Sequence, residues 1–237
     1  PMGPQGPAGE DGVDGEDGMN ATAVCGTCHN LGTMDTVETR YMASVHGIGG
    51  AEGYAGGRKD CAKCHSHEGF KETTHTGRDT TAEAIAIPTK ISCETCHDEH
   101  KTLDFEEDGQ DFALAHNEVV SLMIQDHEME VDLKESSNQC AYCHQPRKPT
   151  GNITLGGDSI STHPHWGPHY GGQAVILSGK GAYEFSGSMD YENTAHTSAT
   201  SCADCHMAET GNMVAGGHTM KMHNEDGSDN MAGCTKC

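Results

Sequence analysis

The chain contains 237 residues and carries a formal net charge of −22, with 36 acidic and 14 basic side chains. This acidic balance argues against nucleic-acid binding, which depends on basic surface, and the chain has no run of 18 apolar residues that would form a transmembrane helix. Leu, Ile, Val and Phe together make up about 12% of the residues, and a share below about 20% combined with high net charge is typical of disordered chains.

Residues 1–20 differ from the rest by a three-residue repeat. Glycine occupies residues 3, 6, 9, 12, 15 and 18, which is the repeat of collagen. So short a repeat favours an extended spacer, and a strand that trimerises or pairs with other subunits is the alternative. We therefore divide the chain into a collagen-like extended segment, 1–20, and a main domain, 21–237.

Five copies of one pentapeptide, Cys-x-x-Cys-His, run through the main domain. They are Cys25, Cys28 and His29; Cys61, Cys64 and His65; Cys93, Cys96 and His97; Cys140, Cys143 and His144; and Cys202, Cys205 and His206. This spacing is the attachment signature of c-type haem. Two thiols on one turn reach the two vinyl groups of a porphyrin, and the next imidazole becomes the proximal ligand of the iron. Zinc sites and disulfides also use paired cysteines, but neither requires histidine directly after the second cysteine.

A sixth copy, Cys234 to Cys237, reaches the end of the sequence one residue before its histidine. The six pairs account for all 12 cysteines, so we expect six haem c groups, and we expect residue 238 of the full gene product to be histidine. One haem for roughly 40 residues could replace a side-chain core and offset an ordering cost of about 1–2 kcal/mol per residue. The chain without haem is therefore expected to be unfolded.

Between the first two motifs the sequence predicts a helix. Apolar residues recur every fourth position over residues 37–45, Thr33 or Asp35 can cap the helix, and Gly47 can end it. His46 would then lie at the C-terminal end of this helix, where it is a candidate axial ligand.

The other connecting segments predict short elements only. Residues 47–57 are rich in glycine and are expected to form a loop. Weak alternation over residues 81–91 indicates a short strand, and residues 112–129 have the pattern of a helix or a strand. A short helix is expected over residues 173–177, ended by Gly179.

Each haem iron also needs a second, distal ligand, and twelve histidines remain for six places once the five motif histidines are set aside. We favour histidines that lie close to a motif or cluster around the only tryptophan: His46, His100, His165, His169, His196 and His218. The remaining histidines are spare candidates: His67, His75, His116, His127, His163 and His223. Four methionines near the fifth motif offer a sulfur ligand instead: Met207, Met213, Met220 and Met222.

Several phrases together resemble one family, the exported multihaem c-type cytochromes of metal-respiring bacteria. They are Cys-His-Asp-Glu-His at 96–100, His-Trp-Gly-Pro-His at 165–169, Cys-Ala-Asp-Cys-His-Met at 202–207 and Gly-Gly-His-Thr at 216–219. The resemblance covers roughly residues 21–237. It implies a mainly irregular fold with short α-helices and very little strand, organised around covalent haems whose irons are each held by two histidines. The truncated last motif and His116 depart from the family pattern.

We expect the function to be electron transfer along a chain of about six haems, because iron with both axial positions filled has no open place for a substrate. The resemblance implies an extracellular or cell-surface location, with the periplasm as the alternative. It also implies redox proteins or extracellular electron acceptors as partners, and some relatives polymerise into filaments, in which a distal histidine could come from a neighbouring chain. We do not expect an enzyme. The alternative is a multihaem reductase of nitrite, hydroxylamine or sulfur oxyanions, which would need one open haem.

Overall fold

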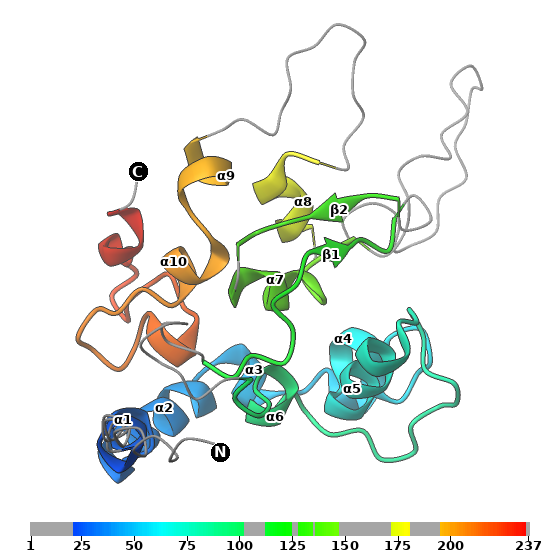
Figure 1. Ribbon diagram of the computed structural model, residues 1–237, viewed down its shortest axis with the longest axis horizontal. Helices are drawn as coiled ribbons and strands as arrows, with labels where there is room; N and C mark the ends of the chain where they lie inside the picture. The colour runs from blue at the N-terminus through cyan, green and yellow to red at the C-terminus, as the bar shows by residue number, and fades with distance from the viewer. Residues whose placement is uncertain are drawn as a thin grey trace, which may run out of the picture. The chain divides into compact units, whose positions relative to one another are not determined.

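The computed structural model describes residues 21–101, 112–124, 128–134, 136–146, 172–180 and 195–235 (Figure 1). The chain divides into two compact units, residues 1–36 and 37–237, and the boundary falls inside helix α2 (Leu31–Met42). Some sequence predictions lie outside the described residues: the collagen-like segment 1–20, His127, His163, His165, His169 and Cys237.

Short helices and irregular chain make up most of the described structure. The helices after α2 are α3 (Val45–Ile48), the π-helical turn η1 (Glu52–Gly56), α4 (Ala62–His65), α5 (His67–Thr76), α6 (Cys93–Cys96), α7 (Ser136–Ala141), α8 (Gln173–Ser178), α9 (Ala195–Ala199), α10 (Cys202–His206) and the 3₁₀ turns η3 (Gly217–Thr219) and η4 (Met231–Cys234). The strands within the described ranges are β1 (Val120–Ser121) and β2 (Glu130–Val131), which pair antiparallel. The prediction of short helices with very little strand is thus confirmed for this part of the chain. None of the helices described is both long and apolar enough to cross a membrane.

Helix α1 (Ala21–Cys28) carries the first cysteine pair, and His29 and Asn30 separate it from α2. The Asn30 side-chain oxygen accepts a hydrogen bond from the Thr33 amide at 2.9 Å, and its amide nitrogen donates to the Gly26 carbonyl at 2.9 Å. Asn30 therefore caps α2, and the helix begins two residues before the predicted cap at Thr33. The prediction that Thr33 or Asp35 caps this helix is wrong.

The helix predicted to run to Gly47 is two helices in the structure. Helix α2 ends at Met42, and Ser44 starts α3 by accepting a hydrogen bond from the Gly47 amide at 2.9 Å. Gly47 does not end the helix but lies within α3, where a Cβ atom would collide with the Tyr41 carbonyl. This close approach needs glycine and turns the chain so that His46 is presented from α3.

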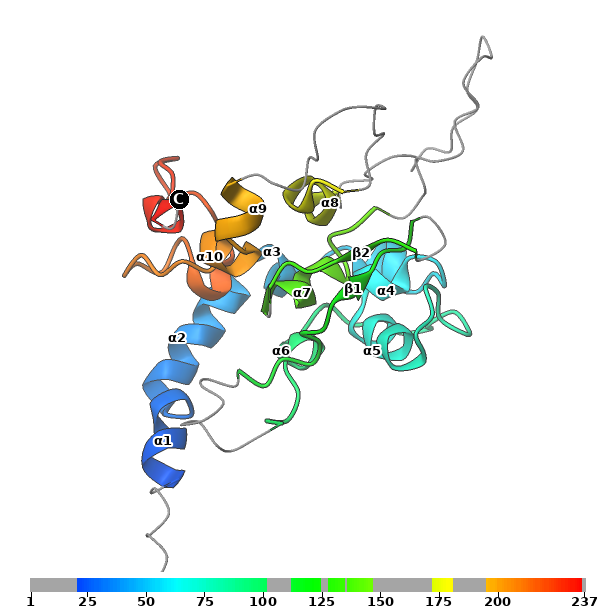
Figure 2. The same cartoon turned by 45° about the horizontal axis from the view of Figure 1, so that its top comes forward.

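Helices α4 and α5 pack side by side (Figures 1 and 2). Ser66 lies between them and caps α5 through the Gly69 amide at 3.2 Å, and Gly77 ends α5 in the left-handed conformation with φ 67°. Phe70 is buried in this pair. The predicted loop over residues 47–57 contains one π-helical turn, η1, which packs against α4.

Residues 81–91 form no strand, so that prediction is wrong. The segment is held by carboxylates of α5: Glu72 accepts from the Ala82 amide at 2.6 Å, and Glu68 accepts from the amide and hydroxyl of Thr89 at 2.9 and 2.7 Å. These carboxylates accept hydrogen bonds from backbone amides that would otherwise donate to a partner strand. This explains why the weak alternation of the sequence does not produce a strand.

The β1–β2 hairpin carries the apolar core that the structure describes. Val120 pairs with Val131 and Ser121 with Glu130. The core cluster consists of Val120, Leu122, Ile124, Val131, Leu133, Ala141 and Ala174. The alanines come from α7 and α8, which pack next to each other beside the hairpin (Figure 2). The predicted helix at 173–177 is confirmed as α8, ended by Gly179 at φ 69°, and residues 112–129 contribute strand β1 rather than a helix in their described part.

The last turn of α2 connects two distant parts of the second unit. The buried Arg40 guanidinium donates to both oxygens of Glu209 and to the Asn212 carbonyl at 2.8 Å. Tyr41, its neighbour, donates its hydroxyl to the Ile91 carbonyl, two residues before the third motif. Burial raises the pKa of Tyr41 to about 12, so the phenol keeps the proton that this bond requires. The adjacent side chains Arg40 and Tyr41 thereby fix the segments that lead to His218 and to Cys93.

Candidate covalent haem sites

Each of the five complete motifs forms a helical turn. The amide of the motif histidine donates to the carbonyl of the first cysteine four residues earlier, at 2.8 Å for His29, 3.2 Å for His65, 2.9 Å for His97 and 2.9 Å for His144. The fifth motif lies entirely within α10. In such a turn, residues three apart share one face. Both thiols therefore lie on the same side, with the imidazole next to them, as attachment of one porphyrin requires.

Two motifs begin with a serine cap that the motif pattern alone does not reveal. The Ser92 amide donates to the Thr95 hydroxyl at 2.9 Å, and the Ser201 amide donates to the Asp204 carboxylate at 2.9 Å. Both are capping boxes, so α6 and α10 each start at the first cysteine. The signal was present in the sequence, as serine followed three residues later by threonine or aspartate, but it departs from the usual glutamate or glutamine.

His46 lies against His144, the proximal histidine of the fourth motif, although 98 positions separate them. The ring centroids are 6.0 Å apart, with 76° between the ring planes. Two imidazoles that hold one metal ion from opposite sides, each with its nitrogen about 2 Å from the metal, have centroids about 6 Å apart. The distance therefore fits an axial pair.

His218 makes the second such pair, with His97 of the third motif. Their ring centroids are 6.3 Å apart and the ring planes are inclined by 29°. Both predicted distal histidines are partly buried. The two pairs share a plan: a motif histidine and a histidine from a distant part of the second unit.

Burial favours the neutral form of three of these imidazoles. It lowers the pKa of His46, His144 and His218, and the neighbouring motif histidine lowers the pKa further for His46 and His218. Metals bind the neutral form of histidine, so the protonation state at neutral pH suits iron ligation.

The ring nitrogen that would face the iron is fixed by the bond the other nitrogen makes. Nδ1 of His97 lies 2.8 Å from the Phe112 carbonyl oxygen, and Nδ1 of His206 lies 3.0 Å from the Met220 carbonyl oxygen. A carbonyl only accepts, so Nδ1 carries the proton and Nε2 keeps its lone pair for a metal. Metal-bound histidines commonly donate their second N–H in this way.

The other predicted ligands in the described ranges differ from these pairs in how far they are exposed. His29, His100, His196 and His206 are exposed, and His65 lies partly buried with the Tyr54 ring 6.2 Å away. Their roles, and those of the histidines outside the described ranges, stay predictions.

Four spare histidines are described, and three of them contact other side chains. Nδ1 of His67 lies 2.9 Å from the Thr95 hydroxyl of the third motif, and His116 packs between Phe70 and Tyr142 with centroids 5.6 and 4.9 Å away. His223 lies 2.9 Å from an Asp229 oxygen on the surface. His75 is exposed on the last turn of α5.

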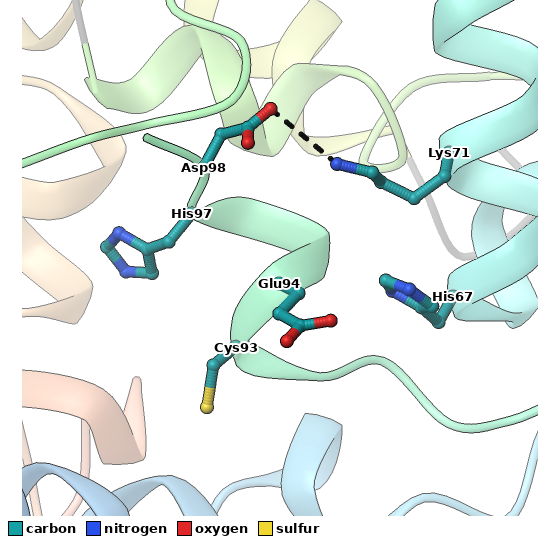
Figure 3. A pocket seen from close by; sticks show the side chains of 6 residues that line it. All are labelled: His67, Lys71, Cys93, Glu94, His97 and Asp98. Atoms are coloured by element: carbon teal, nitrogen blue, oxygen red, sulfur yellow. Dashed lines mark ion pairs between the residues drawn. The ribbon is translucent and has the colours of Figure 1, made fainter. Parts of the chain in front are cut away.

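A pocket of about 340 Å³ lies between α5 and the third motif (Figure 3). Its lining residues are His67, Lys71, Cys93, Glu94, His97 and Asp98. Lys71 and Asp98 form an ion pair across it at 3.7 Å. The His97 ring and the Cys93 sulfur turn away from α5 (Figure 3), which agrees with the pairing of His97 and His218 on another side of this motif.

Thiols of different motifs lie within hydrogen-bonding reach of one another. Cys143 bonds with Cys64 of the second motif, and this bond and burial raise the pKa of Cys143. Cys140 bonds with Cys202 of the fifth motif, a bond that raises the pKa of Cys140 and lowers that of Cys202. Cys205 lies 3.6 Å from the Gly233 carbonyl, next to the truncated sixth copy. The second, fourth and fifth motifs and the start of the sixth are thus neighbours.

The donor set fits covalent haem. The eleven described cysteines are free thiols, and no group of three or more His, Cys, Asp or Glu in the described ranges could hold a metal ion without further ligands. What these residues offer is a thiol pair on one turn with an adjacent imidazole, and, for two motifs, a second imidazole at the spacing of an axial pair. Comparison with protein-family models, with curated proteins and with solved structures finds no match to the chain, so the assignment of these sites rests on the residues and their geometry.

Proposed function

We propose that the chain is an electron-transfer protein that carries six covalently attached c-type haems. The observation that carries this proposal is the pair of histidine contacts, His46 with His144 and His97 with His218, at 6.0 and 6.3 Å. When bound, haem iron supplies reversible one-electron exchange between its ferric and ferrous states.

The two histidine pairs favour electron transfer over catalysis at the third and fourth motifs. A distal imidazole in each pair would fill the position that a substrate of a reductase needs. The Nδ1 bonds of His97 and His206 to backbone carbonyls raise the basicity of the ligating nitrogen. His46 and His144 are partly buried, which limits the contact of water with both rings.

Motif packing supports a connected set of haems rather than isolated ones. The contacts of Cys64 with Cys143 and of Cys140 with Cys202 place three anchoring turns against each other, and α10 packs on η4 at the start of the sixth copy. Groups anchored on adjoining turns lie close enough to exchange electrons without a mobile carrier.

Charge and chemistry suggest where the protein works. A net charge of −22 attracts basic redox partners and repels acidic ones. Covalent haem attachment takes place outside the cytoplasm, so we propose an exported protein that acts at the cell surface or in the periplasm.

The proposal is tested on the purified holoprotein. Intact mass and haem absorbance after denaturation count the haems, and six per chain are expected. Electron paramagnetic resonance (EPR) of the oxidised protein should show low-spin iron throughout, and the reduced protein should bind no carbon monoxide. A stoichiometric high-spin haem that binds carbon monoxide would overturn the electron-carrier proposal and favour a reductase. A chain purified with zinc or disulfides in place of haem would refute the haem assignment itself.

A further inference from the structure

Met220 contacts the candidate ligands of two different motifs. Its thioether sulfur lies 3.1 Å from Nδ1 of His46, and its carbonyl oxygen lies 3.0 Å from Nδ1 of His206. His46 pairs with His144 of the fourth motif, while His206 belongs to the fifth. One residue therefore joins two sites that the chain sequence keeps far apart.

The sulfur contact determines which nitrogen of His46 carries the proton. A thioether has no hydrogen to donate and accepts weakly, so the bond requires Nδ1–H on the imidazole. Nε2 of His46 then keeps the lone pair that an iron would bind. This is the same arrangement that the backbone carbonyls of Phe112 and Met220 impose on His97 and His206, but here a side chain makes it.

The backbone holds Met220 in an unusual conformation. Met220 has φ 56° and ψ 16° and follows η3 in the left-handed region, which non-glycine residues rarely occupy. Its amide donates to the Gly217 carbonyl at 3.1 Å, and the Gly216 amide donates to the Lys221 carbonyl at 3.0 Å. Such strain persists where the surrounding structure imposes it, commonly at functional sites.

The turn that holds Met220 also carries His218, the partner of His97. Residues 216–221 thus serve three motifs: His218 faces the third, the Met220 sulfur faces the ligand pair of the fourth, and the Met220 carbonyl faces the fifth. We propose that Met220 is a positioning residue that fixes the tautomer of His46 and thereby sets the reduction potential of the haem on the fourth motif. This inference rests on the proposed haem ligation.

The test uses Met220→Leu and Met220→Gln in the full holoprotein. Leucine fills similar space but removes the acceptor, so His46 becomes a poorer electron donor and the potential of one haem should rise. Glutamine offers a stronger acceptor, its side-chain carbonyl, so the potential of the same haem should fall below that of the wild type. Both variants keep the main-chain carbonyl that accepts from His206. Met34→Leu, which changes a methionine of α2 that is 48% exposed, is the control and should leave all six potentials unchanged.

Potentials are followed by redox titration of the separate low-spin EPR signals, with six haems per chain verified first. Opposite shifts of one signal in the two variants are expected. Unchanged potentials in both variants would refute the proposal, and so would equal shifts of several signals, which indicate a general loss of structure. Appearance of a high-spin haem in Met220→Leu would show instead that the sulfur itself is an axial ligand. A wild-type protein without low-spin haem would overturn the proposed function before this test begins.

Discussion

Arg40 and Glu209, 169 positions apart, form an ion pair in which one guanidinium nitrogen, Nη1, lies 2.7 and 2.6 Å from the two carboxylate oxygens. The arginine side chain is 9% exposed and the glutamate side chain 65%. The pair joins the last turn of α2 to the segment that leads into η3 and His218. Because Tyr41 on the same turn bonds to Ile91 ahead of the third motif, this one turn orients both members of the His97–His218 pair.

Glu209→Ala should destabilise the holoprotein by about 1–2 kcal/mol, because a buried guanidinium loses its charged partner while the removed carboxylate was largely solvated. The measurement is urea denaturation followed by circular dichroism. The matched control is Glu118→Ala, which breaks the exposed pair between Lys101 and Glu118 and should cost about 0.5 kcal/mol or less. Equal losses in the two variants would contradict a structural role for the buried pair.

His218→Ala should open one haem while leaving every attachment motif intact. On the proposed ligation, the iron on the third motif would lose its distal ligand and become high-spin, and the reduced protein should bind one equivalent of carbon monoxide. His46→Ala should do the same at the fourth motif, and the double variant should bind two equivalents. The control, His223→Ala, changes a surface histidine paired with Asp229 and should bind none. Carbon monoxide binding that does not increase in either single variant would show that these histidines are not ligands.

The two histidine pairs differ in ring orientation, and this difference should be visible in the EPR spectrum. Each imidazole interacts through its π system with one of two iron d orbitals. The planes at 29° in the His97–His218 pair separate these orbitals in energy, whereas planes at 76° in the His46–His144 pair leave them nearly equal. Low-spin signals of both kinds are expected, the nearly axial one being lost in His46→Ala and the rhombic one in His218→Ala. The reverse assignment would contradict the ligand pairing.

His116 should make stability depend on pH. Burial between Phe70 and Tyr142 lowers its pKa, and so do the charges of Lys71 and Lys101, while Glu118 and Asp98 oppose the shift. The unfolded chain then binds a proton more readily than the folded one, so stability attributable to this site is complete above about pH 6.5 and is lost as pH falls below that value. His116→Phe should therefore lose less stability than the wild type between pH 7.5 and about pH 5.5. Parallel curves in urea denaturation would refute the assignment.

Removal of haem should abolish cooperative folding. The described apolar core is a single cluster around the β1–β2 hairpin, and two of its seven members are alanines, which is little for a chain of 237 residues. Chain produced without haem attachment should show no sigmoidal urea transition in far-ultraviolet circular dichroism, while the holoprotein should show one. A cooperative transition in the haem-free chain would mean that side chains alone form a sufficient core.

Sequence patterns were most informative where the chemistry is local. The attachment motifs, the α8 helix and its Gly179 stop are all set by residues within a few positions of one another. His46 and His218 could be selected as candidates by proximity to motifs. Their partners could not be predicted, since each pair joins segments about a hundred residues apart, and the contacts of Arg40 and Tyr41 that orient the His97–His218 pair have no local signature.

Two of the wrong predictions followed a sequence pattern that contacts outside the pattern override. Residues 81–91 alternate weakly, but Glu68 and Glu72 of α5 hold the segment and no partner strand is formed. A glycine at position 47 is typical of a helix end. Gly47 is nevertheless required inside α3, because the Tyr41 carbonyl leaves no room for a Cβ atom. The first contact comes from another element, α5, and the second from a backbone carbonyl six residues earlier, and each overrides a pattern that is correct on average.

The contacts between thiols of different motifs bear on how the protein is made. Cys64 contacts Cys143 and Cys140 contacts Cys202 in the folded arrangement, and neighbouring thiols are open to disulfide formation in an oxidising compartment. Such cross-links would consume one cysteine from the second motif, one from the fifth and both from the fourth. In the proposed holoprotein, thioether formation with the porphyrin would remove those thiols from oxidation. On that proposal the haems would have to be attached while the chain is still extended, with compaction after attachment.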